Sequence, residues 1–318
     1  MKGYQPEGWK IDSIENQYMI SSPSTVYEAM NRGDILEARA IMCDYDHNLI
    51  VNLGCMKGII PRSEGTIGIA EGKVKDIALI SRVGKPVSFV VDSVCPDENG
   101  RLQAKLSRRR AQEKCTREYI ENLRTGDIIG AKITHLEPFG AFCDIGCGII
   151  ALLPIDSISV SRISHPSDRF STGDDIRAVV RSIDDNGRIT LSSKELFGTW
   201  EENANLFSQG QTVSGKVRSV ENYGIFIELA PNLAGLAELR DGVKVGQTAS
   251  VYIKSLNPEK MKVKLIIIDT FDEECEIKSN YFLHDGHIDR WRYSPKCCDR
   301  IIETDFCGVA PLEKRANL

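Results

Sequence analysis

Two pairs of aromatic residues stand at the same spacing in two separate stretches of the chain. Phe139 and Phe142 form the first pair, and Tyr223 and Phe226 form the second. Each pair lies beside an alternating run typical of a half-buried strand, and the phase of that run places Phe142 and Phe226 on its outer face. Unpaired bases stack on exposed aromatic rings whatever their identity. The spacing therefore predicts two stacking surfaces for single-stranded nucleic acid.

Basic side chains accompany both pairs. Lys132 and Lys216 occupy matching outward positions on the preceding predicted strands, where cations can meet the phosphates of a stacked strand. His165 lies in a loop expected near the first surface and is a further candidate contact, although a loop histidine is more often simply exposed. The competing interpretation is that the aromatics pack under loops or against a neighbouring segment. It is less favoured because the pair recurs at one offset.

An internal repeat positions these residues. Segments 33–107, 126–192 and 210–268 align with one another, and each predicts five short strands. The first two segments close with an Asn-Gly turn, which is a strong signal of a β-hairpin. Five strands in a segment of this size can close an antiparallel barrel. The sequence therefore predicts a mainly β protein with three barrels in tandem.

The regions outside the repeat have a different pattern. After residue 108, apolar residues recur at every fourth position, as in a helix, and a weaker helical pattern follows the second segment. The predicted organisation is a loose leader at 1–26, barrels at 27–107, 125–194 and 209–268, helical linkers at 108–124 and 195–208, and a tail of unknown role at 269–318.

The first segment lacks the aromatic pair. His47 and Ile50 stand where the other two segments carry aromatic residues. Because the segment keeps the barrel pattern without the stacking surface, we expect it to serve protein docking or a purely structural purpose.

The run Phe139-Gly140-Ala141-Phe142 and the Gly-Arg-Ile-Thr-Leu-Ser-Ser-Lys run at 187–194 resemble the S1 RNA-binding domain. This family takes its name from protein S1 of the bacterial small ribosomal subunit. The resemblance covers about residues 33–268, and the run 151–170 is most similar to the shorter S1-like proteins of Gram-positive bacteria. It implies three tandem five-stranded OB-fold barrels joined by short helical linkers, with RNA bound on both aromatic pairs.

The resemblance also implies an acidic and a basic residue just before the last strand. In the second segment this pair falls on Asp184 and Arg188, and in the third segment the nearest match is Asn257 with Lys262. The histidine that the family carries after its third strand is absent. Pro154 stands in its place in the second segment and Glu238 in the third, which removes one expected contact.

Other candidate sites carry weaker signals. The run Arg108-Arg109-Arg110 begins the first linker helix, and its side chains either form a solvated helix face or contact phosphates. The ten cysteines are scattered without a Cys-x-x-Cys pair, so we expect reduced thiols and no metal site. No nucleophile stands at a recognisable spacing from a base, and no glycine loop suits a phosphate. We therefore expect neither an enzyme nor a cofactor.

Composition limits the class of protein. The net charge is −5, and no apolar run approaches the length of a membrane span. We expect a cytoplasmic protein without a membrane partner that binds single-stranded mRNA in translation, with 27–107 docking on the small ribosomal subunit. The alternative is a non-ribosomal adaptor that tethers RNA in decay or transcription. Because the chain is mildly acidic, we expect stacking to supply much of the affinity and the salt dependence to be shallow.

Overall fold

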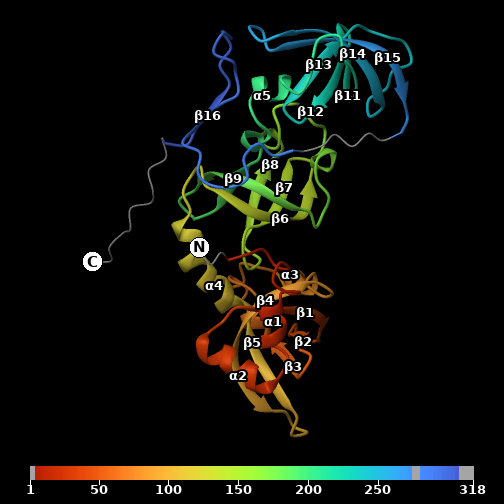
Figure 1. The fold of residues 1–318 in the computed structure, drawn as a ribbon. Coiled ribbons are helices and arrows are strands. Elements are labelled where there is room, and N and C mark those ends of the chain that lie inside the picture. Colours follow the sequence, from red (N-terminus) through yellow and green to blue (C-terminus); the bar gives the residue numbers. More distant parts are fainter. Residues whose placement is uncertain (1–3, 274–279, 308–318) are drawn as a thin grey trace. The chain divides into compact units, whose positions relative to one another are not determined.

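Three closed five-stranded barrels follow one another along the chain in the computed structural model, which describes residues 4–273 and 280–307 (Figure 1). In each barrel the third strand pairs with the fifth in parallel, and the fourth strand pairs with the fifth in antiparallel orientation. This is the topology of the OB fold. The prediction of a mainly β protein with three tandem OB-fold barrels is therefore confirmed.

Contacts divide the chain into two units. The first unit holds the residues up to Leu123 together with Gly130–Lys132 and Asp144–Ile150, and the second unit holds the remainder. The first barrel therefore belongs to the first unit. The third barrel and most of the second barrel belong to the second unit.

The first barrel forms because apolar residues alternate along its strands. Leu36, Ala38 and Ala40 are buried at every second position of its first strand, as expected for a strand with one face on a core. A long loop with two short helices precedes the fourth strand. The elements are β1 (Leu36–Cys43), β2 (Leu49–Asn52), β3 (Lys57–Ile60), η1 (Arg62–Glu64), α3 (Ile77–Ile80), β4 (Pro86–Pro96) and β5 (Leu102–Ser107).

The second barrel repeats this alternation. Ala131 and Ile133 on its first strand and Ala141 and Cys143 on its second strand are buried, as the strand phase predicts. The elements are β6 (Ile128–Glu137), β7 (Gly140–Asp144), β8 (Ile150–Pro154), η3 (Ile155–Ser157), η4 (Pro166–Asp168), β9 (Asp175–Ile183) and β10 (Ile189–Ser192).

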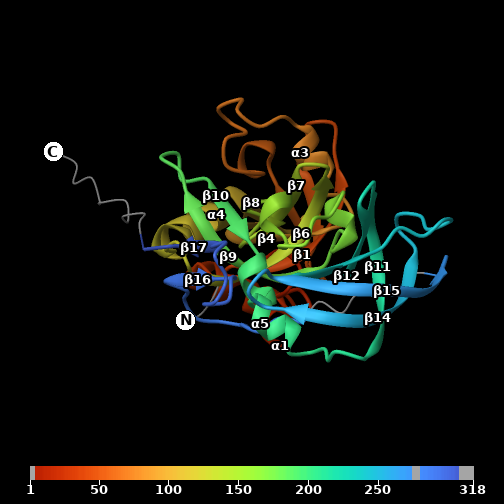
Figure 2. The same ribbon diagram turned by 90° about the horizontal axis from the view of Figure 1, so that it is seen from above.

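The third barrel has the longest strands. Its last two strands form an extended antiparallel pair that Figure 2 shows from above. Ile225 and Ile227 point into its core. The strands are β11 (Thr212–Glu221), β12 (Gly224–Ala230), β13 (Leu233–Ala237), β14 (Thr248–Asn257) and β15 (Lys262–Phe271).

Short helices lie within both predicted linkers. Ser107 caps the first of them by accepting a hydrogen bond from the backbone N–H of Arg110 at 3.0 Å. A Thr199 capping box begins the last one. The elements are α4 (Arg108–Glu118), η2 (Ile120–Asn122), η5 (Lys194–Phe197) and α5 (Trp200–Ala204). No helix within the described residues has the length and apolar character needed to cross a bilayer.

The prediction of a loose leader at 1–26 is wrong. Two helices, α1 (Ile14–Met19) and α2 (Pro23–Arg32), lie in this region, and Met19 and Val26 join the core of the first barrel. The run of serines with Pro23 looked like a flexible stretch in the sequence. It is a helix start instead, because Ser22 caps α2 and proline is favoured in the first helical turn.

The described part of the tail packs on the second unit. Trp291, Tyr293 and Phe306 are buried in the same apolar cluster as residues of the third barrel. Tyr281 stacks on Phe197 with ring centroids 5.2 Å apart and an interplanar angle of 18°. The tail contains one small sheet of β16 (Arg290–Arg292) and β17 (Glu303–Asp305).

Candidate nucleic-acid interface

The second barrel carries an exposed aromatic pair, here named the second-barrel platform and defined by Phe139 and Phe142. Phe139 lies in the turn before β7 with 56% of its surface exposed, and Phe142 lies half-buried on β7. Their ring centroids are 6.0 Å apart at an interplanar angle of 89°. This edge-to-face arrangement leaves ring surface available to a base.

The third barrel repeats this geometry in its own pair, the third-barrel platform of Tyr223 and Phe226. The ring centroids are again 6.0 Å apart, at an angle of 86°, and Tyr223 is 66% exposed. Two platforms of the same shape at the same place in two barrels are not explained by core packing, because the inward positions of these strands are already filled.

A glycine between the two aromatics brings each platform close to its neighbouring strand. A Cβ atom on Gly140 would lie 2.5 Å from the carbonyl oxygen of Leu153, and one on Gly224 would lie 2.6 Å from the carbonyl oxygen of Ala237. Such distances are far below van der Waals contact, and Gly224 also has a φ of 150°. Both positions therefore require glycine for the close approach of the strands.

Cross-strand pairing shows which residues share the outer face with Phe226. Phe226 lies opposite Ser219 on β11 and Leu236 on β13. Leu236 lies opposite Lys264 on β15, and Lys264 is exposed. Lys264 therefore stands in the same row as the platform ring. Sequence reasoning missed it because the parallel pairing of β13 with β15 cannot be seen in local spacing.

Of the three predicted lysines, two stand away from this row. Lys216 lies opposite Glu228, and Glu228 is two residues after Phe226 on β12. Lys132 belongs to the first unit, where its ammonium group lies beside Gly8. Lys262 is exposed and lies opposite Asn257, two positions before Lys264 on the same strand. The structure thus brings Lys262 and Lys264 to the outer face of β15.

Asp184 has a structural role in the hairpin before β10. Its Oδ1 accepts hydrogen bonds from the backbone N–H groups of Asn186 at 2.9 Å and Arg188 at 2.7 Å. The first barrel has the same turn, in which Oδ1 of Asp97 accepts a hydrogen bond from the backbone N–H of Arg101 at 2.8 Å. That barrel has no aromatic pair. The carboxylate of Asp184 therefore holds a turn, while the side chain of Arg188 is exposed.

His165 caps a short helix. Its Nδ1 accepts a hydrogen bond from the backbone N–H of Ser167 at 3.1 Å. The same loop contacts the third barrel, since Asp168 pairs with Arg218 at 2.9 Å. Burial raises the pKa of Asp168, but Arg218 and two backbone N–H groups lower it more, so its pKa lies below the usual range. The loop that was expected to approach RNA therefore joins two barrels.

His135 is a ring that the sequence analysis did not identify. Its imidazole stacks on Phe142 with ring centroids 6.4 Å apart at 23°, and its Nε2 lies 2.8 Å from Oε1 of Glu137. Strict alternation from Ala131 and Ile133 would point residue 135 inward. In β11 the register shifts between Val217 and Ser219, the position that matches His135, and such a bulge reverses the phase.

A buried charge network links the second and third barrels. Glu228, which is fully buried, pairs with Arg218 at 2.5 Å and with Arg169 of the η4 loop. Asn232 makes a second connection, because its amide donates to the carbonyls of Lys194 and Gly198 at 2.7 and 2.8 Å. The second unit therefore holds its two barrels together through specific polar contacts.

The three arginines that begin α4 serve the fold. Arg108 is buried and pairs with Glu7 at 2.7 Å. Arg109 pairs with Glu64 at 2.9 Å, and Arg110 pairs with Asp92. Burial raises the pKa of Glu7, but Arg108, Arg82 and the backbone N–H of Ser88 together lower it more, so its pKa lies below the usual range. Arg108 therefore fits neither of the two interpretations of this run, because it is neither on a solvated helix face nor available to a phosphate.

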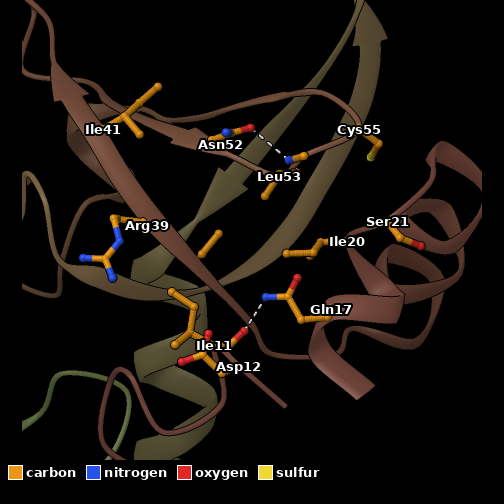
Figure 3. Close-up of a pocket in the computed structure, with 12 residues that line it drawn as sticks. Ile11, Asp12, Gln17, Ile20, Ser21, Arg39, Ile41, Asn52, Leu53 and Cys55 are labelled. Carbon is orange, nitrogen blue, oxygen red and sulfur yellow. Dashed lines mark hydrogen bonds between the residues drawn. The ribbon is translucent and has the colours of Figure 1, made fainter. Parts of the chain in front are cut away.

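The first barrel lacks a platform and has a cleft near its first two strands. The cleft has a volume of about 450 Å³ and lies between α1 and the strands β1 and β2. Figure 3 shows Arg39 and Ile41 on one side and Gln17 and Ile20 on the other. Ile50, at the position of the platform ring, is buried.

Metal-ligating groups do not gather anywhere in residues 4–273 and 280–307 in a way that could hold an ion. Cys115, Cys147 and Cys298 are buried thiols, whereas Cys275 lies outside the described residues.

Comparisons with known proteins agree with this geometry. Residues 122–194 match the family model described as the S1 RNA binding domain. The small ribosomal subunit protein bS1 of Staphylococcus aureus strain COL is 26% identical over 273 residues, covering 81% of this chain and 68% of the relative. The protein of the same name from Leuconostoc lactis is 29% identical over 250 residues, covering 77% and 56%.

Among solved structures, a multidomain protein with nucleic acid binding domains from Streptococcus pneumoniae aligns with 77% of this chain and with 76% of its own length. The sequence identity is 14% and the TM-score is 0.24.

Tandem OB-fold barrels, one of which matches an RNA-binding domain model, define an OB-fold RNA-binding protein. The second barrel is similar to the S1 RNA binding domain, and most of the chain is similar to small ribosomal subunit proteins bS1.

Proposed function

We propose that this S1-like chain acts in translation by holding unpaired RNA on the outer faces of its second and third barrels. The observation that carries the proposal is the aromatic pair that recurs at 6.0 Å and nearly perpendicular in both barrels. Bases stack on Phe139, Phe142, Tyr223 and Phe226, at about 1–3 kcal/mol for each base.

The phosphates then meet the cations beside the platforms. Arg188 contributes from the second barrel, and Lys262 and Lys264 contribute from the third, because all three side chains are exposed. Asp184 and His165 are engaged in a turn and a cap, and Lys132 and Lys216 lie away from the platform row. We therefore assign these four no direct RNA contact.

Binding of this kind favours the unfolded state of an RNA. A protein that binds only the single strand draws the folding equilibrium of the RNA toward that strand. Two weak platforms on one chain gain affinity through effective concentration. The outcome is a chain that keeps an mRNA accessible, in the cytoplasm where translation takes place.

A competition experiment tests this proposal. An unstructured RNA is labelled and bound to the protein, and then displaced either by the same unlabelled strand or by its perfect duplex. We expect the strand to compete at least tenfold better than the duplex, because paired bases cannot reach the rings. Equal competition by the duplex would refute the proposal.

We also propose that the first barrel docks the chain on the small ribosomal subunit. It carries a cleft instead of a platform, and Ile41 and Met42 are half-exposed on β1. Exposed apolar residues beside a cleft suit a protein partner.

Co-sedimentation with purified small subunits tests the docking. The double change Ile41→Asp and Met42→Asp should release the chain from the subunits, while its affinity for free single-stranded RNA stays unchanged. The change Ile77→Asp, at an exposed residue of α3 in the same barrel, is the matched control. Free migration of the unchanged chain at every magnesium concentration would instead favour the RNA-tethering adaptor.

A further inference from the structure

The two platforms differ in one ring. In the second barrel, His135 stacks on Phe142, and its side chain is 64% exposed. In the third barrel, Ser219 stands opposite Phe226. The second-barrel platform therefore has a third ring and ring nitrogens, and the third-barrel platform has neither at that position.

Glu137 determines which nitrogen of His135 carries a proton. The carboxylate Oε1 lies 2.8 Å from Nε2, and an ionised carboxylate can only accept hydrogen bonds. Nε2 must therefore donate to Glu137. In a neutral imidazole this leaves Nδ1 as an acceptor.

The neighbouring hydroxyl of Thr134 adds no competing donor. The hydroxyl of Thr134 donates to the carbonyl oxygen of Phe142 at 3.0 Å. The edge of the platform therefore offers the Nδ1 lone pair and the carboxylate of Glu137. Adenine, cytosine and guanine can donate to such groups through an exocyclic amino group. Uracil has no exocyclic amino group, and its ring N–H lies between two carbonyl oxygens that the carboxylate of Glu137 would repel.

We propose that His135 is a base-recognition residue that makes the second-barrel platform prefer amino-bearing bases over uracil. The ring extends the aromatic surface beside Phe142, and Nδ1 accepts, in the plane of the imidazole, a hydrogen bond from the amino group of a base that stacks on Phe142 next to it. This inference rests on the proposed RNA binding and deepens it, since the third-barrel platform remains indifferent to the base.

The test uses the full chain with Tyr223→Ala and Phe226→Ala, so that binding reports on the second barrel. Affinities are measured for oligoadenylate, oligocytidylate and oligouridylate of equal length. Two changes are compared in this background. His135→Phe keeps a ring but removes the acceptor, and His135→Ser introduces the residue of the third barrel.

We expect the background chain to bind the amino-bearing oligomers about three- to tenfold more tightly than oligouridylate, as one selective hydrogen bond allows. His135→Phe should keep the affinity for oligouridylate and lose this preference. His135→Ser should weaken binding to all three oligomers, because the third ring is gone, and should lose the preference as well.

Three results would overturn the inference, the first two at His135 and the third at the platform. If His135→Phe keeps the full preference, or if neither change has any effect while Phe139→Ala with Phe142→Ala abolishes binding, the platform stands and the role of His135 is wrong. If Phe139→Ala with Phe142→Ala leaves binding unchanged in the same background, the proposed RNA function of the platform fails, and the inference fails with it.

Discussion

Residues of the same type serve different purposes depending on what the fold places beside them. Asp184 and Asp97 hold identical turns, so the acid before the last strand is needed by the hairpin whether or not the barrel has a platform. Lys264 has a counterpart too, because Lys105 stands opposite Ile59 in the first barrel as Lys264 stands opposite Leu236. The first barrel, which has no platform, therefore supplies matched control residues for the two barrels that have one.

The Lys264→Ala change should weaken binding to single-stranded RNA and lower the steepness of its salt dependence. One phosphate contact contributes about −0.7 to the slope of log affinity against log salt for single strands. Affinity measured at several salt concentrations gives this slope directly. Lys105→Ala is the matched control, and an equal loss for both lysines would show that general charge, and not the platform row, is responsible.

The buried pair of Glu7 and Arg108 makes a prediction about stability. Glu7→Gln leaves the guanidinium of Arg108 buried without its partner, which should cost the first unit roughly 3–5 kcal/mol at neutral pH. Urea unfolding followed by hydrogen exchange of first-barrel amides measures this loss. Glu15→Gln, at an exposed position of α1, should have almost no effect.

The same pair also predicts a pH dependence. Folding lowers the pKa of Glu7, so its contribution is present above the unfolded-state pKa of about 4.3. It is lost as the pH falls through the lower folded-state pKa. The stability difference between the unchanged chain and Glu7→Gln should therefore shrink below about pH 4. A difference that stays constant with pH would mean that the ion pair is not its source.

At the scale of elements, the strands that carry the platforms were predictable and their local irregularities were not. Alternation placed Phe142 and Phe226 outside correctly, because one face of each strand must fill the barrel. It could not place residue 135, because the matching strand β11 has a register shift at the equivalent position, next to Ser219, and such a shift reverses the phase. It also read the start of α2 as a loose leader, because serine and proline are typical both of loops and of helix starts.

The glycines beside the platform rings give a prediction at this scale. Gly140→Ala or Gly224→Ala brings a Cβ atom within 2.5 or 2.6 Å of a backbone carbonyl on the neighbouring strand. Each change should destabilise its barrel by about 1–3 kcal/mol and weaken RNA binding without removing an aromatic ring. Thermal unfolding and RNA titration of the same samples check both effects. Gly173→Ala is the control, because its added Cβ atom meets open space. Its loss of stability measures the cost of a positive φ without a steric clash.

At the scale of the whole molecule, the contacts between the second and third barrels could not be read from the sequence. Alternation from Ile225 and Ile227 would place Glu228 on the outer face, yet it is fully buried by Arg169 and Arg218. The tail had no assigned role, yet Tyr293 donates its hydroxyl proton to the carbonyl oxygen of Asn232 at 2.5 Å. Such contacts join residues far apart in sequence, and no periodic pattern in the sequence predicts them.

Asn232→Ala should loosen the connection between these barrels. It removes the partner of two buried carbonyls and of the backbone N–H of Val160, at a cost on the order of 3 kcal/mol. RNA long enough to span both platforms should lose more affinity than RNA that fills one, because effective concentration falls. Titrations with short and long oligomers measure this, with exposed Asn205→Ala as the control. Equal losses for both lengths would contradict it.

We propose that stacking on two aromatic pairs holds the RNA, and a filter-binding titration with the double change Phe142→Ala and Phe226→Ala tests this. Tyr45→Ala, at an exposed ring of the first barrel, is the control. At about 1–3 kcal/mol for each stacked base, the double change should weaken single-stranded RNA binding by at least tenfold, with both barrels still folded. An affinity equal to that of the unchanged chain would contradict the claim.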